Sequence, residues 1–208
     1  MASKSTLRKR MAKCKKLLVS RPMGLKHLGA DSWVIRPRRI QGRKYTEIGS
    51  NSVVLSGSNI CAIADYEGNT YSPSISIGDH VYIGHHVWIT AIGSISIGNG
   101  CVFSEHVYVT DFFHGFSPER GLIMQQGLET KGGVCIGANC FLGFRVAVMP
   151  GVVLGDWCIV GANSVVTRSF PPYSMIAGSP ARLIKVYSHE QRRWVPASQP
   201  KEQIQEQH

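Results

Sequence analysis

The chain has 208 residues, 43% of them hydrophobic, and its 23 basic and 13 acidic side chains give a formal net charge of +10. This length fits one domain with a sizeable core. No apolar run approaches the length of a membrane-spanning helix, and the run Leu17–Val19 is too short for a signal peptide, so we expect a cytoplasmic protein. Six cysteines without paired spacing predict free thiols and argue against a zinc site.

Residues 1–27 are the first predicted unit, a basic arm. They hold nine Lys and Arg residues and no acidic residue, whereas the other 14 basic residues nearly balance the 13 acidic ones. Leu7, Met11, Cys14 and Leu18 recur at helical spacing, which predicts a short amphipathic helix. We expect it to pack on the fold or on a neighbouring subunit. The alternative is peripheral contact with an anionic membrane, at its inner face. Nucleic acid is disfavoured because no known binding motif is present.

A six-residue repeat organises residues 28–187, the second predicted unit. It begins weakly near Leu28 and is clearest over 134–166, where an aliphatic residue recurs at every sixth position and a small or medium residue follows four positions later. These positions are Ile136, Leu142, Val148, Leu154, Val160 and Val166, followed by Cys140, Val146, Val152, Cys158 and Ser164. The spacing fits neither a helix nor a plain strand, and it is typical of a hexapeptide parallel β-helix.

Two segments interrupt the repeat. Residues 64–73 break the register as a loop, and the coils that start at Ile77 and Ile97 then share a 20-residue offset, with two extra residues bulging at one corner. Residues 111–133 form a longer polar excursion, and such excursions from a solenoid are usually functional. We expect an acceptor pocket in these two loops. Pro171-Pro172 is expected to end the β-helix, and residues 188–208 to form a polar, frayed tail.

Three stretches carry a resemblance to a known family: TDFFHG at 110–115, the long run KGGVCIGANCFLGFRVAVMPGVVLGDWCIVGANSVVTRSFPP at 131–172, and AGSPARLIK at 177–185. They are similar to the hexapeptide-repeat acyltransferases, in particular the sugar O-acetyltransferases of the maltose/galactoside and capsular or lipopolysaccharide type. The resemblance implies an all-β fold, a left-handed parallel β-helix. It also implies a homotrimer with active sites between subunits, acetyl-CoA as the acyl donor, and a carbohydrate acceptor, in some cases lipid-linked.

The resemblance also implies roles for individual residues. His114 is the expected general base, because an imidazole with a near-neutral pKa can take a proton from a sugar hydroxyl. Asp111 either fixes the imidazole tautomer or shapes the turn. The remaining expected positions are Phe144 and Ala162 along the pantetheine arm, Thr167, Arg168, Arg182 and Lys185 towards the nucleotide, and His86 and Phe141 beside the acceptor. Phe112 and Phe141 stand where many relatives have His and Trp. No metal is expected, since His80, His85, His86 and His106 lack the spacing of a three-histidine zinc site.

The sequence therefore predicts an acetyl-CoA-dependent O-acetyltransferase that acts on a sugar or a surface polysaccharide. An N-acetyltransferase of an amino sugar would use the same base and cofactor and stays open. A non-catalytic hexapeptide scaffold is the third possibility, and it has no need for His114, an excursion loop and a basic cofactor segment together.

Overall fold

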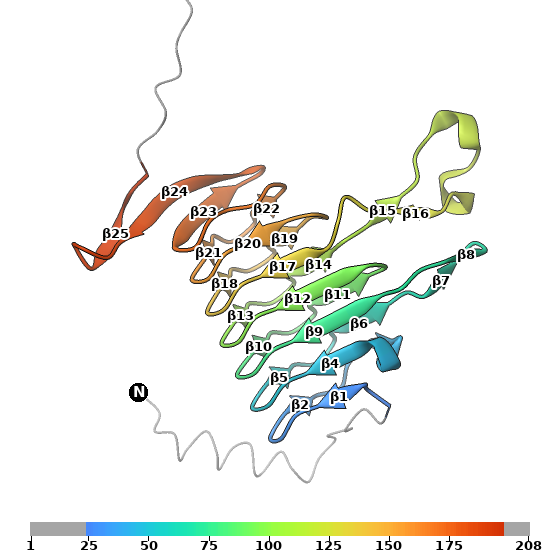
Figure 1. Cartoon of the computed structure of the whole chain (residues 1–208), viewed down its shortest axis with the longest axis horizontal. Coiled ribbons are helices and arrows are strands. Elements are labelled where there is room, and N and C mark those ends of the chain that lie inside the picture. The colour runs from blue at the N-terminus through green and yellow to red at the C-terminus, as the bar shows by residue number, and fades with distance from the viewer. Residues whose placement is uncertain (1–23, 198–208) are drawn as a thin grey trace, which may run out of the picture.

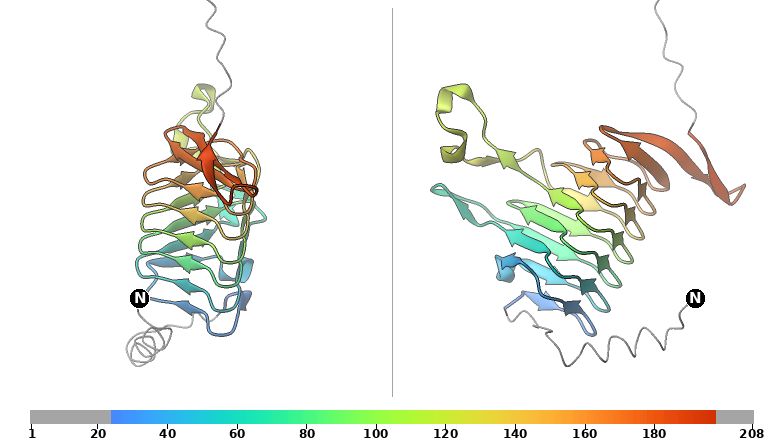
Figure 2. Two further views of the ribbon diagram at one scale, coloured as in Figure 1. Left: turned by 90° about the vertical axis from the view of Figure 1, so that its left-hand side faces the viewer. Right: turned by 180° about the vertical axis from the view of Figure 1, so that it is seen from behind.

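The computed structural model describes residues 24–197, which form a parallel β-helix with three flat sides (Figures 1 and 2). The helix predicted in residues 1–27 lies almost entirely outside the described residues. The first sheet contains β1 (His27–Leu28), β4 (Thr46–Ile48), β9 (Ser74–Ile77), β12 (Ser94–Ile97), β17 (Val134–Ile136) and β20 (Val153–Leu154).

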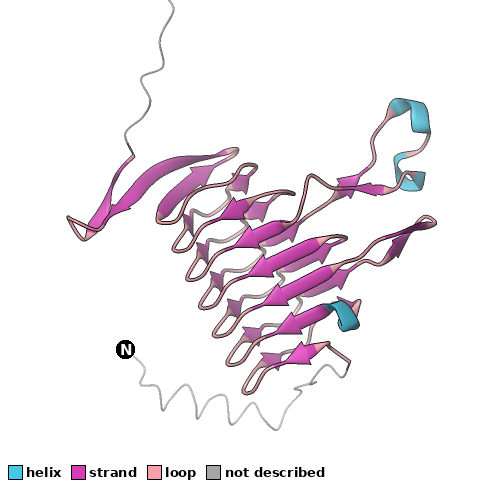
Figure 3. Cartoon of the chain, in the orientation of Figure 1, coloured by secondary structure: helices cyan, strands magenta, loops and turns pink. Residues whose placement is uncertain are grey.

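The second and third sheets complete each coil. The second contains β2 (Trp33–Val34), β5 (Val53–Val54), β10 (Tyr82–Ile83), β13 (Val102–Phe103), β18 (Phe141–Leu142), β21 (Ile159–Val160), β23 (Ser174–Gly178), β24 (Ala181–Ser188) and β25 (Arg193–Pro196). The third contains β3 (Arg39–Gln41), β6 (Asn59–Ala62), β11 (Trp88–Ala91), β14 (Tyr108–Thr110), β19 (Ala147–Val148) and β22 (Val165–Val166). Three short 3₁₀ helices, η1 (Arg43–Tyr45), η2 (Pro118–Arg120) and η3 (Ile123–Gln125), lie in the connections (Figure 3).

The predicted repeat is confirmed residue by residue. Ile77 pairs with Ile97 across the 20-residue coils, and Ile136 pairs with Leu154 across the 18-residue coils. The aliphatic residues that begin the repeats from Ile136 to Val166 are at most 1% exposed, and so are the small residues four positions later. Stacked strands lie about 4.8 Å apart, so each inward side chain packs on its equivalents above and below. Cys101, Cys140 and Cys158 fill the small inward position as free thiols.

Two expectations for the C-terminal end are wrong. Pro171-Pro172 does not end the β-helix, because β23 follows it and stacks in parallel on β21. The prolines occupy a corner whose geometry is retained, and the Tyr173 N–H still donates to the Asp156 carbonyl of the coil below at 2.8 Å. The tail is also partly structured, since Arg193–Pro196 forms β25, which pairs with β24 in antiparallel fashion.

Three kinds of corner join the sheets. The first–second and second–third corners are tight and contain residues in the left-handed region, among them His80 (φ 57°) and His86 (φ 56°). The third–first corner is longer and carries both interruptions of the repeat. The hairpin of β7 (Asp65–Tyr66) and β8 (Asn69–Thr70) replaces the loop expected at 64–73. The excursion 111–133 contains β15 (Phe113–His114) paired with β16 (Leu128–Glu129), and it projects on the same side as β7–β8 (Figures 1 and 2).

None of the helices in the described part of the chain has the length and apolar character of a membrane-spanning segment.

Candidate functional site

The excursion loop is an ordered structure built around Gln126. This side chain is 4% exposed, and its amide donates to the carbonyls of Ser117 (2.9 Å) and Gly121 (3.0 Å) while its oxygen accepts from the Ser117 N–H (3.0 Å). Gly115 lies close against it, since a Cβ at this position would be 3.0 Å from the Gln126 Cβ. Because buried amides that satisfy their hydrogen bonds fix the backbone around them, residues 115–127 hold one conformation.

The β7–β8 hairpin supports the excursion from the preceding coil. The Tyr71 hydroxyl accepts from the Leu128 N–H at 2.8 Å and donates to the Leu128 carbonyl at 3.2 Å. The Tyr66 hydroxyl donates to the Met124 carbonyl at 3.0 Å. Two tyrosines therefore couple segments that are 57 and 58 residues apart in sequence.

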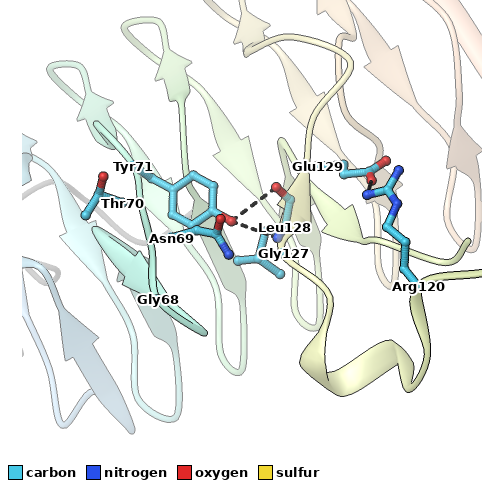
Figure 4. Close-up of a pocket in the computed structure, with 8 residues that line it drawn as sticks. All are labelled: Gly68, Asn69, Thr70, Tyr71, Arg120, Gly127, Leu128 and Glu129. Carbon is cyan, nitrogen blue, oxygen red and sulfur yellow. Dashed lines mark hydrogen bonds and ion pairs between the residues drawn. The ribbon is translucent and has the colours of Figure 1, made fainter.

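A polar cavity of about 520 Å³ lies between these two segments (Figure 4). The hairpin contributes Gly68, Asn69, Thr70 and Tyr71, and the excursion contributes Arg120, Gly127, Leu128 and Glu129. Arg120 Nη1 and Glu129 Oε1 are 3.0 Å apart in an exposed ion pair, which contributes little to stability. Hydroxyl, amide and charged groups of this kind can hydrogen-bond the hydroxyls of a sugar. A pocket expected between segments 64–73 and 111–133 is therefore present.

His114 stands next to this cavity, paired across the β15–β16 ladder with Leu128. Its ring meets the Tyr66 ring edge-on, with centroids 5.4 Å apart at an interplanar angle of 74°. His114 Nδ1 is buried and has no hydrogen-bond partner within residues 24–197. A buried polar atom without a partner is costly, and such atoms in native folds are usually paired with a protein group, an ordered water or a ligand.

Asp111 has a different environment. It is fully buried, and its carboxylate accepts the N–H groups of Ile92 (2.9 Å) and Gly93 (2.8 Å), where the two extra residues of the coil below bulge. Burial raises the pKa of the Asp111 carboxyl, although the backbone N–H groups oppose that shift. The carboxylate makes no hydrogen bond to His114, so within this chain it shapes the corner and does not fix the imidazole tautomer.

The residues expected to hold the pantetheine arm lie on the second–third corner. Phe144 is exposed and accepts the Asn163 N–H at its carbonyl (2.8 Å), and the exposed Ala162 stands one coil above it. The His106 ring packs edge-on against Phe144 at 5.5 Å and stacks on His86 at 5.1 Å. The corner therefore presents a column of rings, with the exposed residue Ala162 one coil above Phe144.

The remaining expected residues lie on the second sheet and at the last third–first corner. Phe141 is 40% exposed on the outer face of β18. Thr167 and Arg168 follow β22, where the Arg168 guanidinium lies 5.1 Å above the Phe170 ring. Arg182 and Lys185 lie on β24, opposite Ala177 and Met175. Within residues 24–197, no hydrogen bond, ion pair or ring contact links His114 or Asp111 to any of the residues expected to bind cofactor.

No cluster of three His, Cys, Asp or Glu side chains suited to a metal ion occurs among the described residues. His85 Nδ1 instead lies 2.9 Å from the Ser56 hydroxyl, and His86 covers Gly57, where any side chain would collide with the imidazole.

The sequence reading did not identify Tyr66, Tyr71 and Gln126. Their spacing from His114 carries no periodic signal, because their roles depend on the contact between two excursions from different coils. The only indication of this contact in the sequence is the pair of tyrosines in the loop at 64–73, because a tyrosine hydroxyl that becomes buried usually needs a hydrogen-bond partner.

Comparison with known proteins identifies the repeat. A family model described as the hexapeptide repeat of succinyl-transferase matches residues 74–111 and 133–168. WbbJ of Escherichia coli K12, assigned to lipopolysaccharide biosynthesis as an O-acetyl transferase, is 36% identical over 129 residues. That alignment covers 59% of this chain and 66% of WbbJ, so the chain spans just under two thirds of that relative.

Solved structures show the same fold. AntD from Bacillus cereus, an N-acyltransferase crystallised with dTDP and 3-hydroxybutyryl-CoA, has a TM-score of 0.64 at 19% identity, over 87% of this chain and 90% of AntD. A maltose O-acetyltransferase from Clostridium difficile 630 has a TM-score of 0.52 at 21% identity, over 89% of this chain and 78% of that one. At these identities the likeness establishes the fold, a left-handed parallel β-helix, as the family resemblance implies.

The environment of Asp111 generates a prediction. Asp111→Ala leaves the N–H groups of Ile92 and Gly93 buried and unpaired, so we expect the free energy of unfolding to fall by about 1–3 kcal/mol. Denaturant unfolding measures this, with Asp65→Ala at an exposed carboxylate as the matched control. A variant of unchanged stability whose turnover alone is lost would contradict the structural role.

Proposed function

We propose that the chain transfers an acetyl group from acetyl-CoA to a hydroxyl of a sugar or surface polysaccharide, a proposal supported by its match to the hexapeptide-repeat model and its similarity to WbbJ. The observation that carries the proposal is His114, whose buried Nδ1 has no partner and whose strand borders a polar cavity. A scaffold has no use for an unpaired imidazole held in an ordered loop.

His114 is the proposed general base. It takes the proton of the acceptor hydroxyl as that oxygen attacks the thioester carbonyl, so that a C–O bond forms and the C–S bond breaks. The proton then passes from the imidazolium to the departing thiolate of CoA. The Tyr66 ring beside the imidazole fixes its position. Because Nδ1 has no partner among residues 24–197, we propose that a neighbouring subunit, the substrate or a bound water supplies the partner that sets the tautomer.

The second–third corner is the proposed cofactor groove. Phe144 and Ala162 are exposed at this corner, and because the Phe144 carbonyl already accepts the Asn163 N–H, the backbone of Ala162 is the group proposed to hydrogen-bond the pantetheine arm. Thr167, Arg168, Arg182 and Lys185 offer a hydroxyl and three cations at the C-terminal end of the coils, where the phosphates would bind. His86 and Phe141 lie at the lower end of the groove, on the acceptor side.

One chain does not complete this site, so we propose a homotrimer. His114 belongs to the third–first corner, whereas Phe144 and Ala162, the residues expected along the pantetheine arm, belong to the second–third corner. We therefore propose that the excursion of one subunit lies over the groove of the next. The outer face of the second sheet suits the contact. Its outward side chains are apolar in coil after coil, at Val53, Tyr82, Val102, Phe141 and Ile159. The first sheet instead presents Glu47, Ser76 and Ser96 in its lower coils, and only its last two strands present Cys135 and Val153. Burying such a face is the main stabilising term in association.

The acceptor is the least defined part of the proposal. The cavity between β7–β8 and the excursion has the volume and the polar lining for a sugar residue, and a lipid-linked sugar is compatible with it. An amine in place of the hydroxyl would use the same base, so an amino sugar is the second candidate. Membrane contact through the basic residues 1–27 is a separate prediction, and it concerns residues almost all of which lie outside the described chain.

Loss of the base gives the direct test. His114→Ala should lower kcat by about 10²–10⁴-fold, the usual contribution of a general base. CoA release from acetyl-CoA is followed by chromatography across sugars that offer either hydroxyl or amino acceptors, and calorimetry should show unchanged CoA binding.

His27→Ala, at an exposed histidine on β1, is the matched control and should keep wild-type turnover. Turnover that is indifferent to His114 would refute the assignment of the base. Transfer to amino sugars alone would replace the O-acetyl assignment with the N-acetyl one.

The proposed subunit interface gives a second prediction. Val102→Glu places a charge at the centre of the apolar column, so the trimer should dissociate to monomers because an unpaired carboxylate is costly to bury. Sedimentation velocity measures the change, and Ser96→Glu on the first sheet serves as the control. A trimer that tolerates Val102→Glu and dissociates with Ser96→Glu would place the subunit interface on the first sheet instead of the second.

A further inference from the structure

A second cavity, far along the chain from the excursion, is lined by aromatic side chains. Its volume is about 360 Å³, and it is lined by Trp157, Tyr173, Tyr187 and Trp194. Trp157 and Tyr173 belong to the first–second corners of the last two coils, whereas Tyr187 and Trp194 face each other across the β24–β25 ladder. In Figure 1, β24–β25 projects to the side opposite β15–β16.

The rings that line this cavity meet at different angles. Tyr187 and Trp194 lie 5.5 Å apart at 72°, and Tyr173 and Tyr187 lie 6.3 Å apart at 32°. The His189 ring packs edge-on against Tyr173 at 4.5 Å. The Tyr187 N–H donates to the Tyr173 carbonyl at 3.1 Å, which ties the hairpin to the corner. The cavity is therefore held by backbone pairing and does not depend on the packing of its rings alone.

The two corner residues are unusual for their conformation. Trp157 (φ 59°) and Tyr173 (φ 61°) occupy the left-handed region, which bulky side chains rarely adopt. In the five coils below, the same corner position holds Asp31, Asn51, His80, Gly100 and Asn139. Most of these are residue types that tolerate this conformation. The change to two large aromatics at the last two corners works against local backbone preference, and such departures cluster at functional sites.

The polar groups of these side chains are available to a ligand. Within residues 24–197, the hydroxyls of Tyr173 and Tyr187 and the indole nitrogens of Trp157 and Trp194 make no hydrogen bond to the protein. Trp157 is 48% exposed, so its ring face is open to solvent. The cavity thus combines apolar ring faces with hydrogen-bonding groups at their edges, which is the pattern of a ligand site.

We infer that this cavity binds a pyranose residue of a glycan chain, at a place separate from the acceptor site beside His114. The apolar C–H face of a pyranose stacks on the electron-rich face of an aromatic ring, and its hydroxyls reach phenol and indole groups at the rim. The choice of a glycan rests on the proposed function, in which the acceptor is a sugar or polysaccharide. A chain held here would keep a long acceptor on the enzyme between transfers.

The surrounding charge favours a neutral or acidic sugar over an organic cation. Residues 181–196 carry Arg182, Lys185, Arg192 and Arg193 against Glu190 alone, and no carboxylate lines the cavity. Aromatic boxes that select quaternary ammonium groups depend on the ring faces for attraction, and nearby cations would oppose it.

Calorimetric binding to the whole chain, without any acyl donor, tests the inference. The probes are maltohexaose as a neutral pyranose chain, hexagalacturonate as an acidic one, tetramethylammonium chloride, and CoA. At least one oligosaccharide should bind saturably. Trp194→Ala should weaken it about tenfold, as expected for losing one stacked ring, while Trp194→Phe retains most of the affinity. Ile184→Ala, at an exposed apolar residue on the paired strand β24, is the matched control and should bind as the wild type does.

Three results would overturn the inference: no binding of either oligosaccharide, equal binding by wild type and Trp194→Ala, or saturable binding of tetramethylammonium alone. A parallel loss of CoA affinity in Trp194→Ala would assign the cavity to the nucleotide instead. Because the assay contains no acetyl-CoA and leaves His114 unchanged, its failure is distinct from a failure of the proposed acetyl transfer.

Discussion

The fixed register between stacked coils is the constraint on which the rest of the structure depends. Each inward aliphatic residue packs on its equivalent one coil away, from Ile77 on Ile97 to Ile136 on Leu154. A slip of one residue would turn every buried side chain outward, so the register is strongly specified. It follows that residues at equivalent corners form columns. The His86–His106–Phe144 stack exists only because three coils present the same corner in line.

The register also determines where the chain can leave the solenoid. Both long departures occur at the third–first corner, so the β7–β8 hairpin and the excursion 111–133 project side by side, and Tyr66 and Tyr71 can join them. Asp111 anchors the start of the excursion by binding the backbone of the coil below. The geometry of His114 is therefore maintained by groups from several coils. This is the kind of support that a catalytic side chain needs in order to keep its position.

The sequence predicts the parts of the structure that repeat. The inward positions from Ile136 to Val166 could be assigned in advance, because six-residue periodicity is typical of this fold and burial enforces it. The parts that depend on contacts between different corners could not be assigned. Gln126 and the two tyrosines have no pattern, and Pro171-Pro172 was interpreted as a stop, although proline fits a corner where its missing N–H is not needed. Asp111 was identified by its position beside His114, yet its partners come from the coil below.

The central claim is that one site is shared between two subunits, with His114 from one and the cofactor groove from the next. Subunit complementation tests it most directly. His114→Ala removes the base, and Ala162→Trp fills the groove, so each variant alone should be inactive. When equal amounts are unfolded together and refolded as mixed trimers, about a quarter of the interfaces should combine an intact base with an intact groove and regain turnover. Mixed trimers that stay inactive, while the refolded wild type recovers, would show that each site is built within a single chain.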